Sequence, residues 1–130
     1  MLPADARARS VCLQWLFWQV SGLGPMLGQF NWYRIKDGPG FDQLRARFAE
    51  EGARLLAVMD RRLAEREFLG GACSIADIAA YPWAIDARQF IEAATGARFA
   101  HIGRWEKAME MRPAVGRGMA VGASMQPAPT

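Results

Sequence analysis

The chain has 130 residues, of which 52% are hydrophobic and 22% are charged. This length makes one domain, and this composition is typical of a folded domain, which excludes a disordered or collagen-like chain. The 16 basic and 13 acidic residues give a net charge of +3, and the two signs alternate over residues 50–67. Such alternation is typical of a solvated helix face with ion pairs, so we expect no nucleic-acid binding.

The cysteines, the histidine and one uncharged stretch indicate the cellular compartment, the metal content and the relation to membranes. Cys12 and Cys73 lie far apart without a C-x-x-C motif, which indicates neither a disulfide framework nor a zinc site and favours a cytoplasmic setting. His101 has no metal-ligand neighbour at the right spacing on its helix, so we expect no metal. The uncharged stretch between Arg9 and Arg34 is long enough to cross a membrane, but its glutamines and its Gly-Leu-Gly-Pro interruption favour a buried helix.

We predict an all-α fold of four or five helices, because nowhere do β-branched and polar residues alternate over the length of a strand. The first helix is expected over residues 3–21, with a bend at residues 22–25 and one further turn at residues 26–28. Residues 31–40, which include Asp-Gly-Pro-Gly, are expected to form a loop.

The later helices have clearer boundaries. A second helix starts with Asp42 as N-cap, follows an apolar stripe and closes at residues 70–71, which are both glycine. A third begins with a capping box formed by Ser74 and Asp77. A fourth spans residues 99–111, a short turn covers residues 114–121, and residues 122–130 are expected to be a disordered tail, so the domain covers residues 1–121.

The first helix carries more apolar surface than one face of a small monomer needs. Projected at 100° per residue, its apolar side chains form two arcs that Gln19 separates on one side: a broad arc of Cys12, Leu13, Leu16, Phe17 and Val20, and a narrow arc of Val11, Trp15 and Trp18. Burial of each narrow-arc side chain is worth roughly 1.5–3 kcal/mol. We therefore expect the narrow arc to meet a partner or other helices of the chain.

Three separated strings carry a family resemblance. They are QWLFWQ at residues 14–19 continuing to GLGPMLGQ at 22–29, LGG at 69–71 with SIADIA at 74–79, and RW at 104–105 with MRPAV at 111–115. Together they resemble the C-terminal helical domain of cytosolic glutathione transferases, in particular the bacterial nu class, whose members are often described as disulfide-bond oxidoreductases. The resemblance covers Asp5 to Val121 and implies the helical bundle of that domain.

The resemblance also implies which parts lie elsewhere. Family members begin with a thioredoxin-like domain that binds glutathione and supplies the residue that activates its thiol, and this sequence has no strands for such a domain. No catalytic residue is therefore assigned, and glutathione is implied as the co-substrate of the family. The implied partner is a second copy, because the family dimerises through the first two helices of this domain, or a thioredoxin-like domain supplied elsewhere.

The resemblance singles out Arg47, because the nu-class Glu-Arg-Tyr aligns without a gap with residues 46–48. In that class the arginine reaches toward glutathione across the dimer interface, and a guanidinium suits a carboxylate through paired N–H donors. Further substrate-contact residues implied near the end of the first helix are Met26, Phe30 and Tyr33, whereas Trp83 and Arg88 are interpreted as packing and solvated residues.

A membrane-associated helical protein is a third alternative with less weight than the two functions that follow. The chain is either the hydrophobic-substrate half and dimer surface of a protein that conjugates glutathione or reduces disulfides with it, or a non-catalytic module that dimerises or binds another protein. The interface candidates in both cases are Val11, Trp15 and Trp18.

Overall fold

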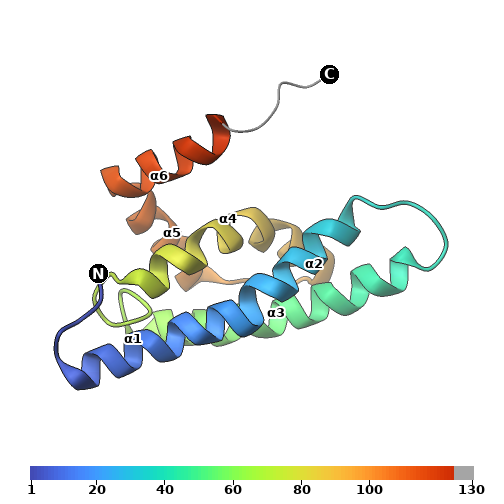
Figure 1. The fold of residues 1–130 in the computed structure, drawn as a ribbon. Helices are drawn as coiled ribbons and strands as arrows, with labels where there is room; N and C mark the ends of the chain where they lie inside the picture. The colour runs from blue at the N-terminus through green and yellow to red at the C-terminus, as the bar shows by residue number, and fades with distance from the viewer. Residues whose placement is uncertain (125–130) are drawn as a thin grey trace.

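The computed structural model describes the backbone of residues 1–124 and the side chains of residues 1–121. In chain order the elements are α1 (Ala6–Trp18), the π-helix η1 (Gln19–Leu23), α2 (Gly24–Arg34), α3 (Phe41–Glu65), α4 (Ile75–Thr95), α5 (Ala100–Glu110) and α6 (Pro113–Ser124) (Figure 1). Within the described residues there is no strand, only an isolated bridge between Phe68 and Gly71. The all-α prediction is confirmed.

The first three elements form one continuous rod. It begins where the Asp5 carboxylate accepts a hydrogen bond of 2.8 Å from the Ala8 N–H. Pro25 lies in the first turn of α2, where a missing N–H costs little. Counted as one segment, the rod gives five helical segments. The predicted loop was wrong for residues 31–34, which continue the helix because Tyr33 stacks on Phe48 of α3.

Helix α3 runs antiparallel to the rod and lies beside it (Figure 1). Its N-cap is Gly40, at a positive φ of 92°, rather than the predicted Asp42, which lies in the first turn and pairs with Arg45. Glycine adopts this left-handed conformation without steric strain. The predicted end at residues 70–71 was also wrong, because α3 ends at Glu65.

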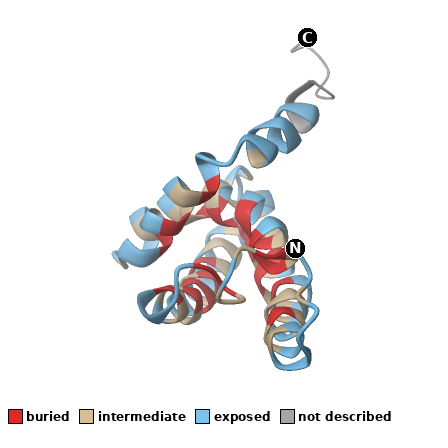
Figure 2. Ribbon diagram, turned by 90° about the vertical axis from the view of Figure 1, so that its left-hand side faces the viewer, coloured by how far each residue is buried: buried red, intermediate tan, exposed pale blue. Residues whose placement is uncertain are grey.

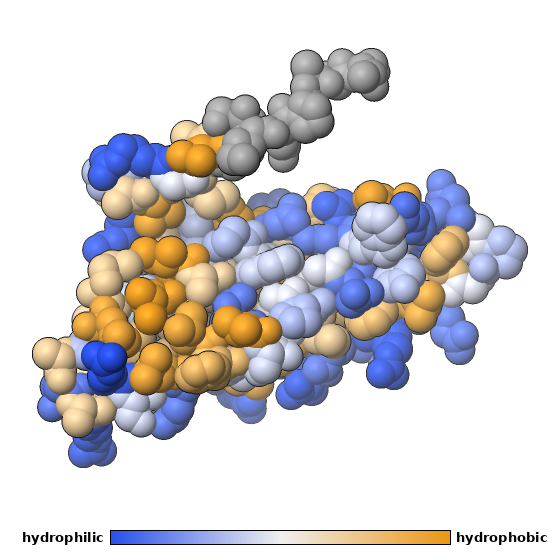
Figure 3. Space-filling view, viewed as in Figure 1, coloured by the Kyte–Doolittle hydropathy of each residue, from blue (hydrophilic) through white to orange (hydrophobic). Residues whose placement is uncertain are grey.

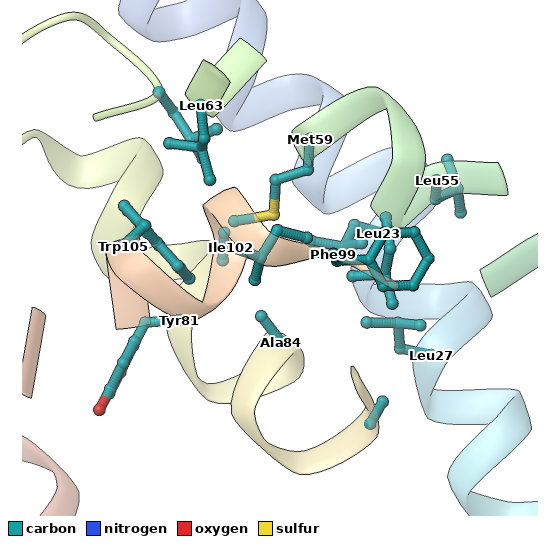
Figure 4. Close-up of a cluster of buried hydrophobic side chains, with 14 of the residues drawn as sticks. Leu23, Leu27, Leu55, Met59, Leu63, Tyr81, Ala84, Phe99, Ile102 and Trp105 are labelled. Atoms are coloured by element: carbon teal, nitrogen blue, oxygen red, sulfur yellow. The ribbon is translucent and has the colours of Figure 1, made fainter. Parts of the chain in front are cut away.

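The core lies where the rod, α3, α4 and α5 face one another (Figure 2). Figure 4 shows Leu23, Met59 and Ile102 converging on its centre from three elements, with Trp105 beside them. The Trp105 ring meets Tyr81 edge to face, with the ring centroids 5.8 Å apart. Burial of such large side chains is the main favourable term in folding.

The predicted capping box at the start of α4 is present. The Asp77 carboxylate accepts hydrogen bonds from the Ser74 N–H and the Ser74 hydroxyl, both at 2.9 Å. The fourth predicted helix is also confirmed, because α5 starts after Phe99 as N-cap and ends one residue before Met111.

Helix α6 is an ordinary twelve-residue helix, so the short turn predicted over residues 114–121 was wrong. It packs mainly against α5 and projects from the bundle (Figures 1 and 2), with half-buried Val115 against the core. Of the predicted tail, residues 125–130 lie outside the described residues. Among residues 1–124, no helix combines the length and the apolarity that crossing a bilayer requires.

Candidate functional site

A cleft of about 560 Å³ lies between the start of α2 and the first half of α3. It brings together Arg47 and Met26, two of the four residues that the resemblance implied as substrate contacts. Phe48, Glu50, Glu51 and Arg54 complete its lining. We call this the Arg47 cleft.

Two arginines and two glutamates line the Arg47 cleft, and only Arg54 and Glu51 form an ion pair. Arg54 donates two hydrogen bonds to Glu51, at 2.8 and 2.7 Å, and these bonds hold the pKa of the Glu51 carboxyl below its usual value. With Glu51 engaged, Arg47 has no ion pair among the described residues. Its N–H donors are therefore free to pair with a carboxylate that enters from outside.

The other two implied contacts have different places. Tyr33 stacks on Phe48 with a centroid distance of 5.5 Å and an interplanar angle of 3°, so it supports the wall of the Arg47 cleft from behind. Phe30 is only 3% exposed and belongs to the core. The six lining residues carry no hydroxyl or thiol. The cleft thus offers the Arg47 guanidinium to a carboxylate and offers no hydroxyl that could activate a thiol.

A second groove, of about 470 Å³, lies between the rod and α4. The Trp83 ring covers Gly24 and Gly28, which lie one turn apart and leave room for it. A Cβ on Gly24 would lie 2.9 Å from Gln19 Nε2 and 3.2 Å from Trp83 Nε1, so two nitrogen atoms converge there. None of the lining residues is charged, and no hydrogen bond of the Gln19 side chain to a described residue is present although Gln19 is only 5% exposed.

Sequence reasoning missed Gln19 and Trp83 as members of this groove. In the helical projection Gln19 was only the boundary between two apolar arcs, and Trp83 was interpreted as a packing residue. The available signal was the glycine pair at positions 24 and 28, because two glycines one turn apart give a flat helix face on which a large ring can lie.

Known proteins are similar to this chain in both sequence and fold. No protein-family model matches it. It is 39% identical over 121 residues to the disulfide-bond oxidoreductase YfcG of Escherichia coli, covering 91% of this chain and 54% of that protein. It is 35% identical over 130 residues to the disulfide-bond oxidoreductase YghU of the same organism, covering 92% of this chain and 44% of that protein. The chain thus spans about half the length of these curated relatives.

Solved structures agree. A glutathione transferase from Burkholderia graminis, with two glutathione molecules bound per subunit, superposes with a TM-score of 0.79 at 38% identity over 90% of this chain and 51% of that chain. A glutathione transferase from Pseudomonas putida, with one glutathione disulfide bound per subunit, superposes with a TM-score of 0.81. The two chains are 34% identical, and the match covers 91% of this chain and 54% of that chain. The chain is a glutathione transferase C-terminal-like helical domain.

In this glutathione transferase-like domain the three interface candidates are partly covered by the chain itself. Val11, Trp15 and Trp18 are half-buried. The two indoles meet edge to face at 5.1 Å, and the Arg62 guanidinium lies 5.7 Å from the Trp15 ring centre.

The most exposed large apolar side chains of α1 and η1 come from the broad arc. Phe17 is 66% exposed, Val20 is 57% exposed and Leu13 is half-buried; we call these three the apolar strip. Figure 3 shows apolar residues gathered over α1 and the first turns of α4. The apolar strip ends in η1, which contains Val20.

Proposed function

We propose that this domain is the helical half of a glutathione-dependent protein that conjugates glutathione or uses it to reduce disulfides. The observation that carries the proposal is the Arg47 guanidinium, which lies beside Met26 and forms no ion pair among the described residues. In the proposed arrangement Arg47 pairs with a glutathione carboxylate, and the groove at Gln19 and Trp83 takes the apolar substrate. The names of YfcG and YghU and the glutathione bound in similar structures support this assignment.

The proposed reaction needs a thiol-activating group from a thioredoxin-like domain. The apolar strip of Leu13, Phe17 and Val20 is our proposed contact for that domain or for a second copy of the chain, with Val11, Trp15 and Trp18 at its border. We place the protein in the cytoplasm, which suits the free thiols of Cys12 and Cys73.

Binding of glutathione tests the proposal directly. We expect tryptophan fluorescence to change and saturate as glutathione is added into the millimolar range. Arg47→Gln should weaken binding about tenfold, because it removes a charge-assisted pair of hydrogen bonds. Arg61→Gln is the matched control, since Arg61 is also exposed on α3 and has no ion pair among the described residues. Equal affinity in the two variants would overturn the role of Arg47.

A second function, a non-catalytic dimerisation module, is favoured by the exposure of Phe17 and Val20. Exposed apolar surface of this kind marks interaction sites in soluble proteins. Light scattering should then show a dimer that the Phe17→Ser, Val20→Ser double variant converts to a monomer. A monomeric wild-type protein at high concentration would contradict this second function and would leave the strip to a different domain.

A further inference from the structure

A third cleft lies where α2 ends, α3 begins and α4 ends, and it borders the Arg47 cleft at Glu50. Its volume is about 800 Å³. Phe30 and Ala49 form an apolar, buried floor, and Ala93 and Ala94 add small side chains from α4. We call it the Arg34 cleft, after the charged residue that the argument below concerns.

The Arg34 guanidinium is held in one orientation by its neighbours. Its central carbon lies 3.9 Å from the centre of the Phe90 ring, and its Nε donates to Asn31 Oδ1 at 3.1 Å. The Asn31 amide in turn donates to the Asp86 carboxylate of α4. Stacking and the Nε bond together fix the plane of the guanidinium, while its two terminal nitrogens have no hydrogen bond to any described residue.

The charged residues around the Arg34 cleft indicate the charge of the ligand that it can bind. The second arginine in the lining, Arg45, already pairs with Asp42 and donates to the Lys36 carbonyl. Arg34 has no ion pair among the described residues, so it is the cation available to a ligand. The Glu50 carboxylate also lines the cleft and would repel a second negative charge on that ligand.

We propose that the Arg34 cleft binds a small organic monocarboxylate, whose carboxylate pairs with the terminal nitrogens of Arg34 and whose apolar body lies on Phe30 and Ala49. A planar guanidinium with both terminal nitrogens free matches a carboxylate in a bidentate pair. The apolar floor favours an aliphatic or aromatic body over a polar one. This site shares only Glu50 with the Arg47 cleft, and its ligand does not need to be glutathione.

Calorimetric titration of the full chain with octanoate tests the proposal, with octanamide as the uncharged probe of the same length. Octanoate should bind, and octanamide should bind about tenfold more weakly because it cannot form the charged pair. Arg34→Met, which keeps an apolar stem for Phe90, should weaken octanoate binding by a similar factor. Arg61→Met removes the same charge from an exposed site on α3 and should leave the affinity unchanged.

Glu50→Gln keeps the proposal testable if Arg34→Met fails to fold. Glu50 is exposed and makes no hydrogen bond to a described residue through its side chain, so its substitution leaves the fold intact. Loss of its negative charge should tighten octanoate binding severalfold and leave octanamide binding unchanged. Equal affinities for octanoate and octanamide, or an unchanged octanoate affinity in Glu50→Gln, would overturn the proposal. Octanoate binding that persists in Arg47→Gln would separate this site from the proposed glutathione site.

Discussion

At the scale of single residues, Asp77 holds together three parts of the chain. Its buried carboxylate accepts hydrogen bonds from the Leu69 N–H at 2.8 Å, from Ser74 and from the Trp105 indole N–H at 3.0 Å. These donors belong to the connection after α3, the start of α4 and the middle of α5. One carboxylate thereby fixes where three segments meet.

Substitution of Asp77 should therefore cost far more stability than loss of its capping partner. We expect Asp77→Ala to lower the free energy of unfolding by about 3 kcal/mol or more, because it leaves several buried donors without acceptors. Ser74→Ala removes one donor and should cost about 1 kcal/mol. Urea unfolding followed by circular dichroism measures both, and similar losses in the two variants would contradict this account.

The two cysteines should differ in reactivity. Burial raises the pKa of the Cys73 thiol, and the Arg112 guanidinium opposes that shift. Since the thiolate is the reactive form, alkylation of Cys73 by iodoacetamide at pH 8 should be slower than that of a free thiol and should still rise above about pH 9. Arg112→Gln should raise the pKa and slow the reaction further, whereas fully buried Cys12 should react only after unfolding.

Mass spectrometry of the alkylated peptides follows each cysteine separately. In concentrated urea, where burial is lost, the difference between Cys12 and Cys73 should disappear. An Arg112→Gln variant whose Cys73 reacts faster than in the wild type would show that the arginine does not stabilise the thiolate.

At the scale of elements, α3 packs closely against its neighbours at Gly52. A Cβ there would lie 2.6 Å from Ile91 Cδ1 and 3.1 Å from Leu27 Cδ2, and both of these side chains are buried. Gly52→Val should therefore destabilise the fold by about 1–3 kcal/mol. Gly103→Ala is the opposite case, because a Cβ at this position in α5 meets nothing within 4 Å. It should stabilise the fold by about 0.5–1 kcal/mol, and thermal unfolding of both variants checks the contrast.

Helices α4 and α5 are tied by Arg88, which donates to Glu106 at 2.9 and 2.7 Å and to Glu92 at 3.1 Å. Hydrogen bonding to Glu106 raises the pKa of Arg88, so its charge persists at alkaline pH. The side chains of Arg88 and Glu106 are 16% and 15% exposed, against 61% and 35% for Arg54 and Glu51.

Double-mutant cycles should separate these two pairs. With Arg→Met and Glu→Gln at each pair, the exposed Arg54–Glu51 pair should show a small coupling energy, and the Arg88–Glu106 pair a larger one. The larger coupling should also resist added salt, because less solvent reaches it. Equal coupling energies for the two pairs would refute this ranking.

Element boundaries were predictable where their signals are local. The capping box at Ser74 and the helix around Trp105 follow from neighbouring residues, and both were predicted correctly. The end of α3 was not, because distant side chains complete it: Arg104 of α5 donates to the carbonyls of Leu63 and Arg66. The continuation of α2 past Phe30 likewise depends on α3. Tertiary contacts override local signals at both places.

At the scale of the whole molecule, α6 contributes little to the bundle. Its packing is mainly against α5, and only its half-buried Val115 is among the described residues that pack against the core. A chain that ends at Arg112 should keep its fold and lose less than about 1 kcal/mol of unfolding free energy. Chemical unfolding of the full-length and shortened chains measures this difference. A large loss would mean that α6 supports more of the core than its contacts indicate.

The proposed sites also differ in whether they could be predicted from the sequence. Arg47 and Met26 were named from the sequence, and the fold places them in one cleft because α2 and α3 lie side by side. The Gln19 groove and the Arg34 cleft could not be predicted, since each needs α4 against the rod in a particular rotation. Sequence periodicity gives the faces of a helix but not which neighbour each face meets.

The π-helix at Gln19–Leu23 sets the position of the Gln19 side chain, although the rod does not need it in order to fold. Gly24 donates its N–H to the Gln19 carbonyl five positions back, so this coil holds one amino acid that an unbroken α-helix would not need. Deleting exposed Ser21 would let the coil tighten to ordinary pitch while the helices on either side keep facing the same neighbours. Such a shortened protein would still fold, yet the Gln19 amide would be displaced from its place beside Trp83.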